Sequence, residues 1–251
     1  MTSERFAPRR ATSLRRDVLQ IPSFGPTRKF RALWLDSRGD VHEAEQTAPA
    51  SVLFDAAHSA FARGTLITTA SGPIAIEDLL PGDRVVTAEH GAQSVLWIGS
   101  MTLAASTGQA DGPCRLTRIM TDAFDAMRPI SDLMVGPGAR FLSYPRHLRA
   151  RFGNDPVLTP AHAMKDGMQI IDVFPRHPVT LYHLCLETHG IVSANGMQTE
   201  SFHPGAGFER GLDKATLEQF LGLFPHVDAP RDFGPLAHMR LPLDTPDALD
   251  I

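Results

Sequence analysis

Cysteine is scarce in this chain of 251 residues, which contains only Cys114 and Cys185. Two cysteines are too few for a disulfide framework, and they fit a reducing compartment. We therefore expect both to be small buried apolar side chains rather than reactive thiols.

Long hydrophobic runs and a strong charge imbalance are also missing. No segment approaches the roughly 18 to 20 continuous apolar residues that a membrane-spanning helix needs. The formal net charge is only −4, which gives no electrostatic argument for nucleic acid or a membrane surface as a partner. The arginine-rich first 20 residues lack the apolar core of a secretory signal. These observations predict a cytoplasmic protein that binds neither nucleic acid nor membranes.

What the chain does contain is an ordinary globular composition, with 43% hydrophobic and 21% charged residues. The two ends of the chain are expected to have a different structure from the main domain between them. Alternating polar and apolar residues from Phe30 to Leu35, a turn, and a return from Val41 predict a hairpin. Asp213 is a good N-cap for a helix over 214–223. The predicted organisation is a disordered arm (1–26), an N-terminal hairpin and connector (27–58), a main domain (59–205) and a helical tail (206–251).

The main domain has the pattern of an all-β fold. Short runs rich in β-branched residues alternate with glycine and proline turn signals. Asn195-Gly196 is the strongest hairpin signal, and Asp83 is expected to cap the turn at Gly82. One short helix is predicted from Thr159 to Gly167. The predicted strands are 65–69, 74–76, 84–87, 93–98, 132–135, 141–142, 168–173, 179–186, 190–194 and 197–202.

Three separated blocks carry a more specific signal. The first is FARGTL followed by GPIAIEDLLPGDRVVT, the second is DLMVGPGARFL, and the third is LYHLCLETHGIVSANGMQTESFHPG. In this order, over about residues 59 to 205, they resemble the Hint domain of inteins and Hedgehog autoprocessing proteins, and above all its bacterial stand-alone form. The resemblance implies a horseshoe or disk of bent β-hairpins, in which the first and last strands meet near the active centre.

The family's chemistry needs groups that this chain lacks. In active members a cysteine before Phe-x-x-Gly-Thr attacks the preceding carbonyl, and a Thr/Ser and a His of the second block assist the leaving nitrogen. Those positions fall on Ala60, Gly136 and Ala139. Thr199-Glu200 stands where a closing His-Asn pair would be, and His189 matches the closing-block histidine. We therefore predict a retained fold with no catalytic residue, no cofactor and no metal, which would not be an enzyme.

Other functions remain open at this point. The chain could bind a protein or peptide in the former active-site groove, with the small residues Ala60, Gly136 and Ala139 as its lining. Alternatively, residual self-cleavage near residue 60 could use Ser59 or Thr65 as the nucleophile. A third hypothesis is a metal-dependent hydrolase that draws on His183, His189 and His203, although their spacing matches no known zinc motif.

Overall fold

The computed structural model describes residues 25–105, 115–145 and 153–243, and Cys114 therefore lies outside the described residues. Strands dominate it, with two short α-helices, α1 and α3, among the described elements. The elements are β1 (Thr27–Leu35), β2 (Val41–Pro49), α1 (Val52–Ala56), β3 (Phe61–Ala62), β4 (Leu66–Thr69), β5 (Gly72–Ala75), β6 (Arg84–Thr87), β7 (Gly91–Leu103), β8 (Leu116–Ile119), β9 (Leu133–Val135), β10 (Arg140–Ser143), β11 (Val157–Pro160), β12 (Ile170–Val173), β13 (Val179–Leu186), β14 (Ile191–Ala194), β15 (Met197–Glu200), α3 (Lys214–Leu221) and β16 (Met239–Arg240).

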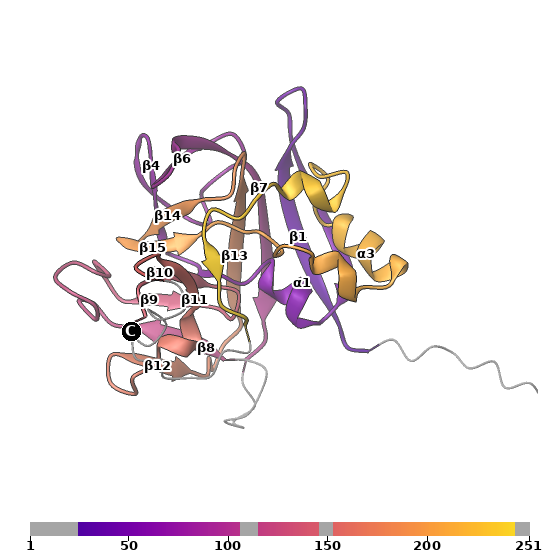
Figure 1. Cartoon of the computed structure of the whole chain (residues 1–251). Helices are drawn as coiled ribbons and strands as arrows, with labels where there is room; N and C mark the ends of the chain where they lie inside the picture. The colour runs from indigo at the N-terminus through magenta and orange to yellow at the C-terminus, as the bar shows by residue number, and fades with distance from the viewer. Residues whose placement is uncertain (1–24, 106–114, 146–152, 244–251) are drawn as a thin grey trace, which may run out of the picture.

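The long strand β7 joins the two halves of the molecule. Its first residues pair with β6, and its later residues pair with β1 on one edge and β13 on the other. Figure 1 shows β7 and β13 in the centre, with β1, α1 and α3 on one side and β14, β15 and β10 on the other. The main path of the sheet runs β12-β8-β9-β3-β13-β7-β6-β4-β14-β15-β10-β11-β16. The predicted all-β Hint architecture is confirmed.

The side chains of β7 point alternately to its two faces, and each face packs into a separate hydrophobic core. Trp97 belongs to an aromatic core beside α1 and α3, whereas its neighbour Ile98 belongs to the core of the β-body. Successive residues of a strand point to opposite faces, so one strand supplies both cores. The Trp97 indole N–H donates to the Leu223 carbonyl at 2.7 Å, as a buried indole requires.

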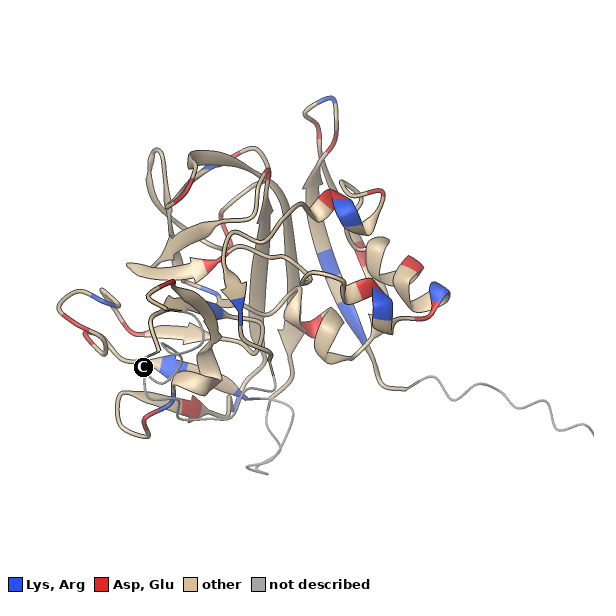
Figure 2. Ribbon diagram, in the orientation of Figure 1, with Lys and Arg blue, Asp and Glu red and all other residues tan. Residues whose placement is uncertain are grey.

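The N-terminal hairpin is confirmed and is continuous with the sheet. β1 pairs with β2 along its whole length and also with β7. Two basic residues of β1 pair with glutamates of β2, and Figure 2 colours the basic residues blue and the acidic ones red. Lys29 lies 2.8 Å from Glu45, and Arg31 lies 2.5 Å from Glu43. These exposed cross-strand pairs neutralise one another and leave little net charge on the hairpin.

The turns and the helix start that were predicted from single residues are also present in the structure. Asn195 and Gly196 have φ of 46° and 83°, which the two-residue turn between β14 and β15 needs. The Asp83 carboxylate accepts from the Leu80 N–H at 2.8 Å. Asp213 accepts from the Thr216 N–H at 2.8 Å and begins α3.

The predicted helix from Thr159 to Gly167 is wrong. Residues Val157–Pro160 form β11, which pairs antiparallel with β10, and only Ala161–Met164 make a 3₁₀ turn. Proline tolerates the end of a strand as well as the start of a helix, and pairing with β10 decides between them. The strand predicted for 93–98 extends to 91–103 because its ladder continues along β13. Among the described helices, none is long and apolar enough to cross a membrane.

Candidate functional site

The peptide bond between Ser59 and Ala60, called the junction below, lies where α1 leads into β3. Both residues are completely buried. The Ala60 N–H donates to the Tyr182 carbonyl at 2.9 Å, and the Ala60 carbonyl accepts from the Gly136 N–H at 3.0 Å. The Ser59 carbonyl accepts from the Gly138 N–H at 3.0 Å. The first and second sequence blocks therefore meet at the junction, as the resemblance implied.

Residues 136–138, called the glycine loop, press directly on the backbone before the junction. A Cβ added to Gly136 would lie 2.2 Å from the Ser59 carbonyl oxygen, and one added to Gly138 would lie 2.3 Å from the Ala56 carbonyl oxygen. Such close approach of two backbones is possible only without side chains. Gly136 and Ala139 are buried like Ala60. The expectation that these three residues leave room in an open groove is therefore wrong, because backbone fills the space.

The two alternative nucleophiles are held in structural contacts. The Ser59 hydroxyl oxygen lies 3.2 Å from the Gly138 N–H, which donates to it. The Thr65 hydroxyl donates to the Ala62 carbonyl at 2.8 Å and so closes a turn. Both side chains are buried. These contacts give both hydroxyl groups a structural role.

Around the closing block, sequence reasoning missed a buried cluster of charged groups. Glu200 is fully buried, and its carboxylate contacts Arg240 at 2.8 Å, His189 at 3.0 Å and Arg140 at 3.5 Å. We call these four residues the anchor cluster. Arg140 directly follows Ala139 in the second block, so the cluster joins the second block to the closing block and the tail. The available signal was Glu200 inside the predicted strand 197–202 and Arg140 directly before the predicted strand 141–142.

The charges of the anchor cluster support one another. Burial alone would raise the pKa of Glu200, but Arg240, His189 and Arg140 together lower this pKa to about 2. Burial and the nearby Arg240 lower the pKa of Arg140 to about 10. The His189 Nδ1 accepts from the Ala237 N–H at 2.9 Å, so its Nε2–H donates to Glu200. His189 therefore connects the closing block to the tail.

The three histidines of the metal hypothesis are used in other ways. His203 donates from Nε2 to the Gly234 carbonyl at 3.0 Å and accepts at Nδ1 from the Gly205 N–H at 2.9 Å. His183 is buried and accepts at Nδ1 from the Leu184 N–H. Within the described ranges, no three His, Cys, Asp or Glu side chains are grouped so that they could hold a metal ion.

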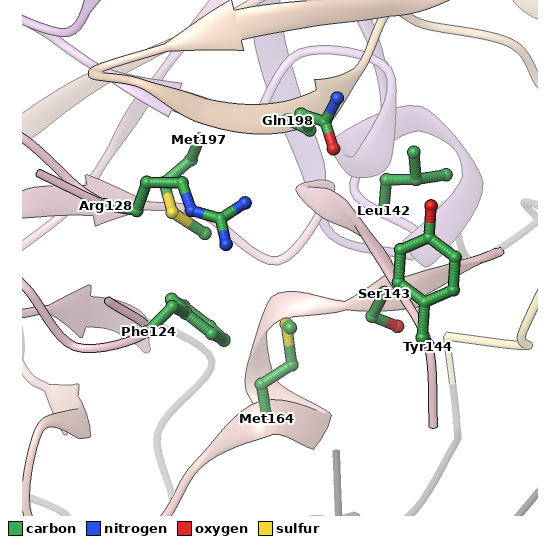
Figure 3. Close-up of a pocket in the computed structure, with 8 residues that line it drawn as sticks. All are labelled: Phe124, Arg128, Leu142, Ser143, Tyr144, Met164, Met197 and Gln198. Carbon is green, nitrogen blue, oxygen red and sulfur yellow. The ribbon is translucent and has the colours of Figure 1, made fainter. Parts of the chain in front are cut away.

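A pocket of about 250 Å³ lies where β10 and β15 diverge, on the strand that continues from Ala139. The two strands pair only at Phe141 and Thr199. Figure 3 shows β15 on one wall, β10 and its following residue on the other, and Arg128 reaching between them. The apolar lining is Phe124, Leu142, Met164 and Met197, and the polar lining is Arg128, Ser143, Tyr144 and Gln198.

The bent all-β body and the meeting of the three blocks at the junction define a protein of the Hint class. The family model described as "Hint domain" matches residues 59–206, which is more than half of the chain. The chain therefore belongs to the Hint domain family.

The solved structures that match this chain include inteins and an intein-like domain. The solution structure of a bacterial intein-like domain from Clostridium thermocellum is 16% identical, with a TM-score of 0.39, and the match covers 58% of this chain and 99% of that one. A splice-inactive variant of the AceL NrdHF class 3 split intein is 13% identical, with a TM-score of 0.39, and the match covers 57% and 97%. Among curated proteins, none matches the chain.

Proposed function

We propose that this Hint-family protein does not cleave itself and instead acts as a binding module for a protein or peptide partner. The observation that supports the loss of chemistry is the closed junction, which has no nucleophile and no acid. We also propose the cytoplasm as its location, on the basis of its low cysteine content.

Self-cleavage would need two groups at the junction. A side chain at position 60 must attack the Ser59 carbonyl carbon, and an acid must protonate the Ala60 nitrogen as it leaves. Ala60 offers a methyl group, while Gly136 and Ala139 offer neither hydroxyl nor imidazole. The Gly138 N–H still donates to the Ser59 carbonyl and polarises it. One donor without a nucleophile produces no reaction, because these groups act as a unit.

The test is the mass of the full-length protein under denaturing conditions, after prolonged incubation with thiol and hydroxylamine. Denaturation is essential because β1 and α1 precede the junction but pack against β7 and α3, which follow it. The two parts of a cleaved chain would therefore stay together in native buffer. We expect one uncleaved species.

A pair of fragments ending and beginning at residues 58–60 would overturn the proposal. A Ser59→Ala variant then separates the two origins of such fragments. Loss of the cleavage would identify Ser59 as the nucleophile, and persistence would indicate another group such as Thr65.

A further inference from the structure

We propose that the pocket between β10 and β15 receives one aromatic side chain of an extended peptide in a partner protein. This inference rests on the proposed binding function and names its site. Its support comes from the size of the pocket, its lining and the charges at its mouth.

The volume of the pocket matches a single ring. An apolar cavity of roughly 150 Å³ takes up benzene, and this pocket offers about 250 Å³. That is below the range of roughly 300 to 1,000 Å³ usual for small-molecule sites. The pocket therefore suits one aromatic side chain better than a whole cofactor.

The lining is suited to an aromatic group. Met164 and Met197 are almost completely buried, and both present flexible, polarisable side chains to the cavity. Methionine sulfur makes favourable contacts with aromatic rings, and methionine adapts to the shape of its partner. The guanidinium of Arg128 extends over the same space in Figure 3, where it can lie against the face of a ring.

The charges at the mouth favour a peptide over a free aromatic acid. Asp125 already holds Arg128 through both Nε and Nη2, so the pair as a whole carries no net charge that would attract a carboxylate. The Gln198 amide and the Tyr144 hydroxyl add neutral hydrogen-bonding groups. Peptide N–H and C=O groups on either side of an aromatic residue fit such a rim.

Exposed apolar side chains extend this surface beyond the pocket. Tyr144 is 57% exposed, and Met127 and Ile130, on either side of Arg128 in the chain, are 63% and 56% exposed. Their loop is fixed against the β14–β15 turn, where the Ile130 N–H donates to the Asn195 carbonyl at 2.9 Å. Aromatic residues, methionine and arginine are the types enriched at protein interfaces. A peptide that inserts a ring would cover these side chains as well.

The experiment uses the full-length protein labelled with ¹³C at its methionine methyl groups. N-acetylphenylalaninamide is titrated in, with N-acetylglycinamide as the negative control. We expect saturable shifts at Met164 and Met197. Met101, buried in the other core, and Met168, which is 79% exposed, should not shift. Equal shifts at Met168, or none at Met164 and Met197, would overturn the proposal.

Two further comparisons sharpen the result. A Leu142→Trp variant should fill the pocket and weaken binding at least tenfold, whereas Leu80→Trp places the same ring on an exposed residue outside the lining and should leave affinity unchanged. N-acetylphenylalanine, which carries a free carboxylate, should bind no more tightly than the amide. Tenfold tighter binding of the acid would show an anion site and overturn the peptide assignment. A negative titration would not affect the mass measurement that tests the loss of self-cleavage. The two proposals can therefore be refuted separately.

Discussion

At the scale of single residues, the absence of a side chain at Gly136 and Gly138 sets the geometry of the junction. Each glycine brings its own backbone to within contact distance of another backbone segment, and no flexible side chain is available to move aside. Both glycines thus serve the packing of the backbone at the junction. Two histidines next to the junction contacts, His58 and His183, are completely buried, and this burial lowers the pKa of each.

Replacing Gly136 with alanine should destabilise the fold by about 2 to 3 kcal/mol, the cost typical of overpacking a rigid core. The new methyl group would meet the Ser59 carbonyl oxygen and carbon, which are backbone atoms. Gly211→Ala is the matched control, because nothing lies within 4 Å of a Cβ there. Urea denaturation gives the free energy of unfolding of both variants. An unchanged free energy of unfolding for Gly136→Ala would contradict the close packing.

Introducing the missing nucleophile should not restore cleavage. Ala60→Cys supplies a thiol, but its nitrogen keeps the hydrogen bond to Tyr182 and meets no acid from positions 136 or 139. We expect a single full-length species in denaturing mass spectrometry after incubation with hydroxylamine. Fragments starting at residue 60 would show that the remaining groups suffice for the acyl shift.

Acid should weaken the protein through two fully buried histidines. Burial lowers the pKa of His58 to about 4 and that of His183 to about 3, against roughly 6.5 in an unfolded chain. Between these values the unfolded chain binds more protons, so the stabilisation is present above pH 6.5 and is lost as the pH falls towards 4. The expected loss between pH 7.5 and 5 is about 2 kcal/mol per histidine.

His58→Phe tests this assignment, since His58 lies among the rings of Phe30 and Trp97, at 4.6 and 5.2 Å between centroids. Whatever its stability at pH 7.5, the variant should lose about 2 kcal/mol less than the parent on moving to pH 5. Urea unfolding at the two pH values gives both differences. The same loss in parent and variant would rule out His58 as a titrating group.

At the scale of elements, the short strand β16 is held to the body by a brief ladder and by a buried side-chain contact of Arg240. It pairs with β11 over only two residues, and Arg240 reaches from it to the carboxylate of Glu200. Its Nη1 also donates to the His203 carbonyl at 2.9 Å. The anchor cluster thus fixes the tail, which a two-residue ladder could not do alone.

Arg240→Met should destabilise the protein by about 3 kcal/mol, the lower end of the range for breaking a buried ion pair, because Glu200 keeps Arg140 and His189. Arg231→Met is the control, since Arg231 is 89% exposed beside Asp232. Its effect should stay below about 0.5 kcal/mol. Limited proteolysis should also cut the tail of the Arg240 variant first. Equal stability of the two variants would refute an anchoring role.

Local sequence signals could predict those elements that depend on contacts between residues close together in the chain. The hairpin at Asn195-Gly196, the cap at Asp213 and the β-branched runs needed no knowledge of the fold. β8, β11 and β16 were beyond such reasoning, because their pairing joins segments far apart in the chain. The blocks likewise predicted that Ala60 and the glycine loop meet. The anchor cluster could not be predicted, since Arg240 lies outside every block.

At the scale of the whole molecule, the Hint region is not separate from its flanks. The family match covers residues 59–206, yet Trp97 within it shares a core with Phe54 and Phe224, which lie before and after the matched range. β1 also occupies one edge of β7. The flanking segments complete a core that the matched region only half builds.

A chain reduced to residues 59–205 should therefore fail to fold on its own. It would expose the aromatic core around Trp97 and leave the β7 edge unpaired, which favours aggregation. The full chain should show one cooperative thermal transition by circular dichroism, and the shortened chain none. A cooperative transition of similar midpoint in the shortened chain would contradict the shared core.

The anchor cluster also bears on the role of the chain that follows the closing block. In Hint proteins that release a downstream segment, the closing block is the place where that segment departs. Here Glu200 stands at that place and holds Arg240 of the tail. The described part of the tail is therefore a structural part of the fold. Sequence changes after residue 200 would thus alter how firmly the fold is closed.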